Sequence, residues 1–153
     1  MDNIKLREAT ELDLTILIEF EQEIIKIERA FDNSLKDGEF HYYDFPNLIA
    51  SPDAKILLAE IDSKIIGSGY AVIKDADSFL KHRSYAYIGL MYVVPSYRGR
   101  GINQQILQNL KDWIIEKQIK EIRLVVYDEN LLAKNAYKKA GFKGHVLEMR
   151  MEI

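Results

Sequence analysis

Two arginines and two glycines lie where a strand-like run gives way to a helical pattern, and this arrangement suits phosphate binding. The stretch reads Val93-Val94-Pro95-Ser96-Tyr97-Arg98-Gly99-Arg100-Gly101-Ile102-Asn103. The first N–H groups of a helix lack intrahelical partners and carry partial positive charge, so backbone amides can hold a pyrophosphate. Gly99 and Gly101 have no Cβ, which allows unusual dihedrals and a close approach by a ligand. Taken alone, Arg98 to Gly101 would more often be a basic surface turn or a fragment of an RNA-binding tail.

The flanking residues favour phosphate binding. The run Tyr85 to Val94 is rich in aromatic and β-branched residues and ends at Pro95, as expected of a strand. After the glycines, apolar residues recur at helical spacing, and polar residues occupy the opposite face. The apolar positions are Ile102, Ile106, Leu110, Trp113 and Ile114. A strand, a glycine turn and a helix start are therefore predicted in that order.

A second segment, Asn130 to Phe142, is predicted to form a short helix. Its small and aromatic residues share one face, and Gly141 supplies a C-terminal stop. The residues on that face are Ala133, Ala136, Tyr137 and Ala140. Considered without the glycine turn, Tyr137 would more simply be a core aromatic residue.

In these two motifs the chain resembles the GNAT superfamily of acyl-CoA-dependent N-acetyltransferases. The family signature, Gln/Arg-x-x-Gly-x-Gly/Ala after a strand ending Val-x-Pro, is matched by Arg98 to Asn103 preceded by Val93-Val94-Pro95. The family's Asn-x-x-Ala-x-x-x-Tyr-x-x-x-Gly-Phe ending is matched by Asn130 to Phe142. Asn103 departs from the usual small residue, so its side chain is expected to point away from the pyrophosphate or to cap the helix.

The resemblance implies transfer of an acetyl group from acetyl-CoA to a primary amine of a small molecule, peptide or protein, by direct attack in a ternary complex. Tyr137 is implied as the acid that protonates the leaving thiolate, and a backbone N–H near Val93 as a stabiliser of the oxyanion. The strand backbone is implied to bind the pantetheine arm, and Asn130 to contact the cofactor from the other side. The implied cofactor contacts are Met91, Tyr92, Val93, Arg98, Gly99, Arg100, Gly101, Ile102, Asn103, Asn130 and Tyr137.

The sequence does not identify the general base. Where some relatives carry an acid, this chain has Val125 and Gly89, and neither can accept a proton. The remaining candidates are Glu28, Asp44, His41, Tyr87 and Tyr92. Because the segment from Phe31 to Pro52 mixes aromatic and acidic residues, it is interpreted as a binding loop for a small or cationic amine acceptor.

Two other classes of function compete with this interpretation. The first is a non-catalytic acyl-CoA-binding or sensing module, which the lack of an evident base would favour and the presence of Tyr137 disfavours. The second is a nucleotide-binding enzyme or a phosphate-dependent regulator. The chain carries neither the Gly-x-x-x-x-Gly-Lys-Ser/Thr loop nor the dinucleotide Gly-x-Gly-x-x-Gly fingerprint, which argues against the second class.

Composition supports one compact enzyme domain over residues 1–153, since 48% hydrophobic content in 153 residues is enough for a single core. A net charge of −3 argues against nucleic-acid or anionic-membrane partners. There is no cysteine, and His41, His82 and His145 lack metal-ligand spacing, so no metal is expected. Met1 to Lys5 has no apolar signal core and no run is long enough to span a membrane, so a cytoplasmic location is expected.

The predicted fold is α/β, with a single mixed, largely antiparallel sheet flanked by helices in the order β α (α) β β β α β α β. The first helix opens at Ala9 to Asp13, with Leu14, Leu17, Ile18, Ile24 and Ile25 on its apolar face. Gly67 and Gly69 indicate a bulge or a close approach. The predicted strands are Ile4 to Arg7, Ile56 to Ile61, Ile65 to Ile73, Tyr85 to Val94, Ile122 to Tyr127 and Val146 to Ile153. The alternation in the last strand also suggests a strand-mediated homodimer.

Overall fold

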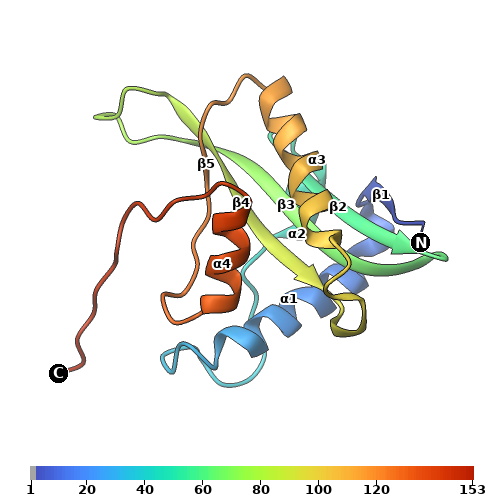
Figure 1. The fold of residues 1–153 in the computed structure, drawn as a ribbon, viewed down its shortest axis with the longest axis horizontal. Coiled ribbons are helices and arrows are strands. Elements are labelled where there is room, and N and C mark those ends of the chain that lie inside the picture. The colour runs from blue at the N-terminus through green and yellow to red at the C-terminus, as the bar shows by residue number, and fades with distance from the viewer. Residues whose placement is uncertain (1–2) are drawn as a thin grey trace.

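A computed structural model describes residues 3–153 and shows one five-stranded sheet with helices on both faces (Figure 1). Met1 and Asp2, which belong to the N-terminal segment considered above, lie outside the described residues. The strands neighbour one another in chain order, and all pairs are antiparallel except β4 and β5, which are parallel. The expected mixed, largely antiparallel sheet is confirmed. The strands are β1 (Lys5–Glu8), β2 (Ala54–Ile61), β3 (Lys64–Asp75), β4 (Ser84–Val93) and β5 (Ile122–Arg123).

The helices divide between the two faces of the sheet, and alternate strand residues supply the two cores. On β2, Leu57 packs into the core shared with α3, whereas Leu58 packs into the core shared with α1 and α2. Figure 1 shows α1 behind the sheet and both α3 and α4 in front of it. The helices are α1 (Leu14–Glu28), α2 (Phe45–Ala50), α3 (Ile102–Glu116) and α4 (Leu131–Lys139), with short 3-10 turns η1 (Glu11–Asp13) and η2 (Pro95–Tyr97).

The predicted apolar faces of the two long helices are confirmed with one exception. In α1, Leu17 and Ile25 are fully buried, but Ile18 is 37% exposed because it lies at the edge of the contact with the sheet. In α3, the apolar residues Ile102, Ile106, Leu110 and Ile114 are all buried. The glycines of β3 allow this packing, since a Cβ on Gly69 would lie 2.6 Å from atoms of Ile106 and Met91. The predicted close approach is therefore confirmed.

The segment from Phe31 to Pro52 is more ordered than a binding loop. It contains α2, whose N-terminus is capped by the Asp44 side chain accepting from the backbone N–H of Asn47. Pro46 occupies the first turn of this helix, where its missing N–H costs nothing. Phe45 is 3% exposed and anchors the helix in the core beneath α1.

Two predicted strands are wrong in extent. The strand expected over Ile122 to Tyr127 pairs with β4 only at Ile122 and Arg123, because the chain then turns away from β4. The strand expected over Val146 to Ile153 is absent, and this segment extends away from α4 without a backbone partner in the described structure (Figure 1). An alternating pattern forms a strand only where a neighbouring strand is available to pair with it.

Candidate functional site

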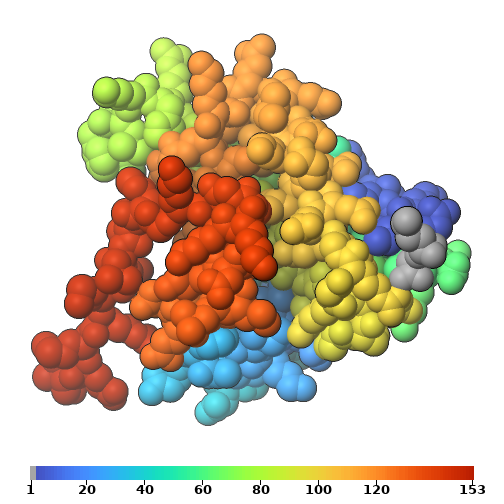
Figure 2. Space-filling model, in the orientation of Figure 1, coloured from blue at the N-terminus to red at the C-terminus, as the bar shows by residue number. Residues whose placement is uncertain are grey.

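The parallel strands β4 and β5 separate from each other after two residue pairs. Ala86 pairs with Ile122 and Tyr87 with Arg123, after which β4 continues to Val93 without β5 beside it. The α4 helix and the glycine turn lie on the two sides of this opening. In Figure 2 the orange-red surface of α4 and the yellow surface of residues 95–101 face each other across a narrow recess.

A β-bulge reorients β4 beside the opening. Leu90 has a φ of 54°, and the pairing of β3 with β4 shifts register here. Ile88 packs into the core shared with α3, but Leu90 packs into the core on the other face of the sheet. The bulge thus changes which side chains face which core, an effect that simple alternation cannot predict.

Two hydroxyl groups hold the bulge in place. The Ser68 hydroxyl, fully buried, donates to the Leu90 carbonyl oxygen at 2.8 Å. The Leu90 N–H donates to the Tyr43 hydroxyl at 3.2 Å. Sequence reasoning missed both residues, since Ser68 and Tyr43 lie 22 and 47 positions from Leu90. A serine inside an apolar strand is the signal that could have drawn attention to Ser68.

Beyond the bulge, the backbone of Val93 is directed into the opening. The N–H of Val94 bonds to the Ile66 carbonyl oxygen of β3 at 2.9 Å. Successive residues of a strand direct their amides to opposite sides, so the Val93 N–H points away from β3. The Val93 carbonyl oxygen accepts from Nε of Arg98 at 2.9 Å, which ties the glycine turn to the end of β4.

The glycine turn has the conformation expected of it. Gly99 and Gly101 have φ values of 77° and 76°, in the left-handed region that favours glycine. Gly101 is the N-cap of α3, and no side chain caps this helix. The expectation that Asn103 might cap it is therefore wrong, because glycine already occupies the capping position. Within residues 3–153, the first-turn N–H groups of residues 102–104 have no hydrogen-bond partner.

Both arginines of the turn lie against aromatic rings. The Arg98 guanidinium is 5.8 Å from the centre of the Tyr92 ring, and the Arg100 guanidinium is 5.1 Å from the centre of the Tyr97 ring. These contacts orient the two guanidinium groups over the aromatic rings. The end of β4 and the start of α3 therefore combine positive charge with unpaired amides, which is the chemistry of an anion site.

On the opposite side, α4 supplies Tyr137. Its ring stands edge-on to Phe142, with the ring centres 5.8 Å apart, and its hydroxyl has no hydrogen-bond partner in the described part of the chain. Burial raises the pKa of the Tyr137 phenol, and the nearby Tyr87 of β4 raises it further. Tyr87 is the last residue of β4 that pairs with β5. Because Tyr137 interacts with Tyr87, Tyr137 lies beside the opening.

The rest of α4 differs from its predicted form. The Asn130 side chain accepts from the N–H of Ala133 at 3.2 Å and so serves as the N-cap of the helix. None of the helical residues of α4 is fully buried, and Ala136 and Ala140 are exposed because nothing packs over that side. The predicted apolar face is therefore only half covered.

The structure explains why Gly89 cannot be replaced by an acid. A Cβ at Gly89 would lie 2.3 Å from Cε1 of Tyr70, so the Tyr70 ring already fills the space of that side chain. The ring of Tyr70 packs edge-on to that of Tyr43, whose hydroxyl holds the bulge. Val125, the other position considered for a base, is 81% exposed.

We expect Gly89→Ala to destabilise the protein by about 1–3 kcal/mol, the usual cost of overpacking a core. For a chain of this size each kcal/mol lowers the Tm by about 2–4 °C. Gly144→Ala is the matched control, since its Cβ would meet no atom within 4 Å. Thermal unfolding of the two variants checks the prediction, and equal melting temperatures would contradict it.

Three of the candidate bases are occupied elsewhere. Asp44 caps α2 through Asn47, as described above. His41 Nδ1 lies 2.6 Å from an oxygen of the fully buried Glu21, and this hydrogen bond raises the pKa of His41, which favours its protonated form. Tyr92 packs its ring against Phe20 of α1, 4.8 Å away between ring centres.

Glu28, at the end of α1, is the candidate acid that the structure places among tyrosines. The Tyr42 hydroxyl donates to its carboxylate at 2.7 Å. Burial raises the pKa of Glu28, and the charge of Glu28 in turn contributes to the raised pKa values of Tyr87 and Tyr127. Tyr87 also contributes to the raised pKa of Tyr137, so Tyr87 interacts electrostatically with both Glu28 and Tyr137.

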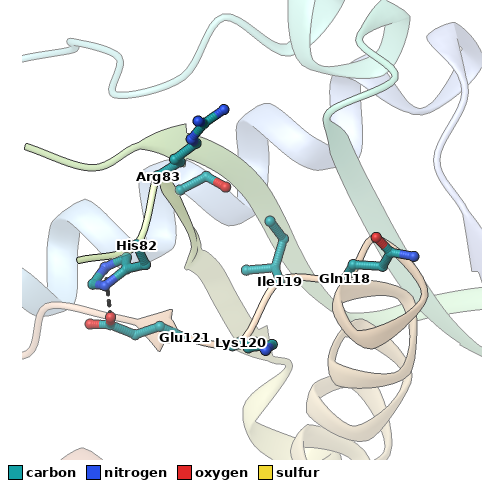
Figure 3. A pocket seen from close by; sticks show the side chains of 7 residues that line it. His82, Arg83, Gln118, Ile119, Lys120 and Glu121 are labelled. Carbon is teal, nitrogen blue, oxygen red and sulfur yellow. Dashed lines mark ion pairs between the residues drawn. The ribbon is translucent and has the colours of Figure 1, made fainter. Parts of the chain in front are cut away.

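A separate cavity of about 340 Å³ lies at the other end of β4, where the strand begins (Figure 3). In this cavity His82 Nε2 lies 2.7 Å from a carboxylate oxygen of Glu121. Arg123 bonds to the same carboxylate at 2.8 Å. These groups satisfy one another, and the glycine turn follows the opposite end of β4, so this cavity is not part of the site.

The sequence model that describes the acetyltransferase (GNAT) family matches residues 21–142 of this chain. This range is most of the chain and includes both motifs. The chain belongs to this family. As a GNAT acetyltransferase it is an enzyme of acyl transfer, which removes the support for a non-catalytic binding module. GNAT acetyltransferases use acetyl-CoA, and the fold is that of their solved structures.

Two curated relatives of this GNAT acetyltransferase are enzymes. A thialysine N-ε-acetyltransferase of Bos taurus is 28% identical over 146 residues, covering 90% of this chain and 83% of the relative. A streptothricin acetyltransferase of Escherichia coli is 26% identical and covers 76% of this chain and 68% of the relative. Among solved structures, a predicted acetyltransferase with acetyl-CoA from Clostridium acetobutylicum has a TM-score of 0.75 at 24% identity, covering 97% of this chain and 96% of that one.

No helix within residues 3–153 is both long and apolar enough to cross a bilayer. The described residues contain no cluster of three or more potential metal ligands.

Proposed function

We propose that this GNAT acetyltransferase transfers the acetyl group of acetyl-CoA to a primary amine, by direct attack in a ternary complex. The observation that carries the proposal is the opening between β4 and β5. It has unpaired helix amides and two arginines on one side and the unpartnered hydroxyl of Tyr137 on the other. An anionic cofactor with a thioester arm fits such a site, because its phosphates and its sulfur need different partners.

The residues around the opening suit the different parts of acetyl-CoA. The glycine turn offers free N–H groups at residues 102–104 and the positive charge of Arg98 and Arg100, which suit a pyrophosphate. The backbone of Met91, Tyr92 and Val93 runs along the opening as a strand edge that β5 does not pair with, which suits the amides of the pantetheine arm. Asn130 precedes the helix on the other side, and its side-chain oxygen caps α4. Its amide nitrogen has no hydrogen-bond partner among the described residues and would contact the cofactor.

The chemistry assigns a role to each wall of the opening. The amine nitrogen forms a bond to the thioester carbon, and the bond from that carbon to sulfur breaks. The Val93 N–H would stabilise negative charge on the carbonyl oxygen. Tyr137 would give its proton to the leaving sulfur, and a base must take one proton from the amine nitrogen. The phenol suits this role because its unperturbed pKa of about 10 is close to that of a thiol.

We further propose a cationic acceptor, with Glu28 as the base and the anchor for its charge. A half-buried carboxylate surrounded by tyrosines suits an ammonium group, because the carboxylate offers charge and the ring faces offer a second attraction. The relatives named above act on thialysine and streptothricin, as their names state, and this supports an amine acceptor. Burial raises the pKa of Glu28, and this shift is in the direction of a more effective base.

The test is a panel of primary amines incubated with acetyl-CoA and the purified protein, with release of the free thiol as the readout. Diamines and lysine-like amines are expected to be acetylated, and neutral aliphatic amines of the same length to react more slowly. Binding of CoA is measured separately by calorimetry, with ATP as the comparison ligand. Thiol release without any dependence on an added amine would contradict the proposal.

Replacement of Gly101 by valine tests the glycine turn. A β-branched residue at a φ of 76° is strained, so we expect the turn to shift and to misdirect the amides that follow it. The dissociation constant for CoA is expected to rise about tenfold, equivalent to about 1.4 kcal/mol. Gly38→Val is the matched control, since Gly38 has a φ of 79° and lies in the segment between α1 and α2. Equal CoA affinity in the two variants would count against the turn as the phosphate site.

A further inference from the structure

One carboxylate of α1 is fully enclosed and has no part in the chemistry described so far. Glu21 has an exposed fraction of 0%, and the other buried acid of the described chain, Asp13, forms an ion pair with Arg7 at 2.8 Å. A carboxylate removed from water is costly unless hydrogen-bond donors surround it. The donors that surround Glu21 therefore indicate what it does.

The donors to Glu21 come from the segment between α1 and α2. Oxygen Oε2 of Glu21 accepts from the backbone N–H groups of Tyr42 and Tyr43, at 2.9 and 3.0 Å. Oxygen Oε1 lies 2.6 Å from Nδ1 of His41. One side chain thus binds three consecutive residues, and it binds two of them through the main chain.

The next residue of α1 holds the start of the same run. The Gln22 side-chain nitrogen donates to the Phe40 carbonyl oxygen at 2.9 Å and lies 3.4 Å from Oε1 of Glu21. Figure 1 shows the segment after α1, in cyan, turning back toward α2. Two neighbouring residues of α1 therefore fix four consecutive residues, 40–43, against the helix.

The two tyrosines whose N–H groups bind Glu21 direct their hydroxyls to two different parts of the candidate site. The Tyr42 hydroxyl donates to Glu28 at 2.7 Å. The Tyr43 hydroxyl accepts from the Leu90 N–H at 3.2 Å, at the bulge of β4. A tyrosine has only two side-chain torsions, so the position of its backbone largely decides where its hydroxyl lies.

We propose that Glu21 is a positioning residue for acetyl transfer. Through Tyr42 it orients Glu28, the base. Through Tyr43 it holds the bulge that directs the Val93 N–H into the opening. Because Glu21 is fully enclosed, it contacts neither substrate and acts only through the segment that it binds. The inference rests on the proposed function, since that function supplies the roles of Glu28 and Val93.

Loss of the Tyr42 contact has a consequence for the pH dependence of the reaction. Burial raises the pKa of Glu28, and the hydrogen bond from Tyr42 partly offsets this by favouring the ionised form. Without that bond the pKa of Glu28 rises further. A base acts when deprotonated, so the acid limb of kcat/KM moves to higher pH. The titratable groups that interact with Glu28 are Asp32, Tyr42, Tyr43, Tyr87 and Tyr127.

A change at Glu21 also affects the charged groups that face it. These are His41 and, beyond it, Glu39, which lies 3.4 Å from Nε2 of His41. His41→Gln separates this route from the proposed one, because it removes the imidazole and leaves the bonds from Tyr42 and Tyr43 to the carboxylate in place. The variant is expected to keep the acid limb where it is.

The first experiment compares three variants of α1 in kcat/KM for a diamine. Glu21→Met removes both oxygens at similar side-chain length, and kcat/KM is expected to fall about 10²-fold, the cost of misplacing a reacting group by about 1 Å. Glu21→Gln keeps one oxygen that can accept from both tyrosine N–H groups, so most of the activity is expected to return. Glu19→Met, a change at an exposed residue of the same helix, is the matched control.

The affinity for CoA is expected to change far less than kcat/KM, because the phosphates bind at the glycine turn. If circular dichroism shows that Glu21→Met is unfolded, Glu21→Asp takes its place, since it keeps the charge but is one methylene too short to reach both N–H groups. Equal kcat/KM in Glu19→Met and in the folded Glu21 variant would overturn the proposal.

The second experiment records the pH profile. Tyr42→Phe and Glu21→Met are each expected to move the acid limb to higher pH, and the double variant is expected to move it no further, because both changes break one pathway. An unmoved limb in Glu21→Met, or the same shift in His41→Gln, would refute the positioning role. An acid limb that persists in Glu28→Gln would instead contradict the proposed base.

The third experiment does not depend on activity. Hydrogen exchange of the backbone amides of Tyr42, Tyr43 and Leu90 is expected to be faster in Glu21→Met, since the first two lose their acceptor and the third depends on the Tyr43 hydroxyl. The Val94 amide, which bonds to Ile66 of β3, is the internal reference. Unchanged exchange at Leu90 would show that Glu21 does not act on the bulge.

Discussion

Tyr137→Phe is expected to lower turnover by about 10²–10⁴-fold, the usual contribution of a general acid, while the affinity for acetyl-CoA stays within about twofold. The variant removes one oxygen and keeps the ring that packs edge-on to Phe142. Since the Tyr137 hydroxyl has no partner in the described protein, its loss leaves no buried group unsatisfied. The fold is therefore expected to be unchanged, and the effect falls on the departure of the thiolate.

Steady-state kinetics at saturating amine and acetyl-CoA, together with calorimetric CoA binding, check this prediction. Tyr127→Phe is a matched control, because the Tyr127 hydroxyl already bonds to Asp32 and is not free to donate elsewhere. If Tyr137→Phe kept its full turnover, Tyr137 would have no part in proton transfer. A leaving group with a lower pKa than CoA should partly restore the activity of Tyr137→Phe, which a purely structural role would not explain.

Glu28→Gln is expected to lower kcat/KM for a diamine by about 10²-fold, because the change removes both a base and the charge that attracts the ammonium group. The amide retains the shape of the side chain and can still accept from the Tyr42 hydroxyl. The KM for acetyl-CoA is expected to stay the same, since Glu28 lies at the end of α1, away from the glycine turn.

The pH dependence gives a separate test of Glu28. A base acts when deprotonated, and burial raises the pKa of Glu28, so activity should fall as the pH drops through a value above the usual 4.5. Glu28→Gln should lose this acid limb. Glu39→Gln is the matched control, because Glu39 lies in the segment that follows α1 and has a side chain that is 70% exposed. Within residues 3–153 its one ion pair is with His41, at 3.4 Å. Equal losses in the two variants would show a general charge effect instead of a specific base.

The C-terminal part shows how local pattern and tertiary context can disagree. The alternation over Val146 to Ile153 is a genuine strand pattern, yet the segment has no partner within its own described chain. The six residues predicted for β5 likewise reduce to two pairs, because β4 and the rest of the run diverge. Strand propensity describes a residue that fits a half-buried sheet, and the sheet itself must come from elsewhere in the chain or from a partner.

Some features of the candidate site could likewise be predicted from the sequence, and others could not. The glycine turn, the start of α3 and Tyr137 could be predicted, since each depends on spacings of a few residues. The bulge at Leu90, the hydroxyls of Ser68 and Tyr43 that hold it, and the choice of Glu28 among the candidate acids could not be predicted. These features depend on groups 14 to 47 residues apart, and no local pattern records such contacts.

By itself, the sequence determined that a glycine turn leads into a helix and that a later helix carries a tyrosine, because glycine conformation and helical periodicity are local properties. The tertiary structure decided that both face one opening between β4 and β5, and that Asp44 and His41 are committed to other partners. It also decided that the last eleven residues lie outside their own sheet. Such decisions follow from packing and strand pairing between distant segments, where burial and available neighbours outweigh the preference of any single residue.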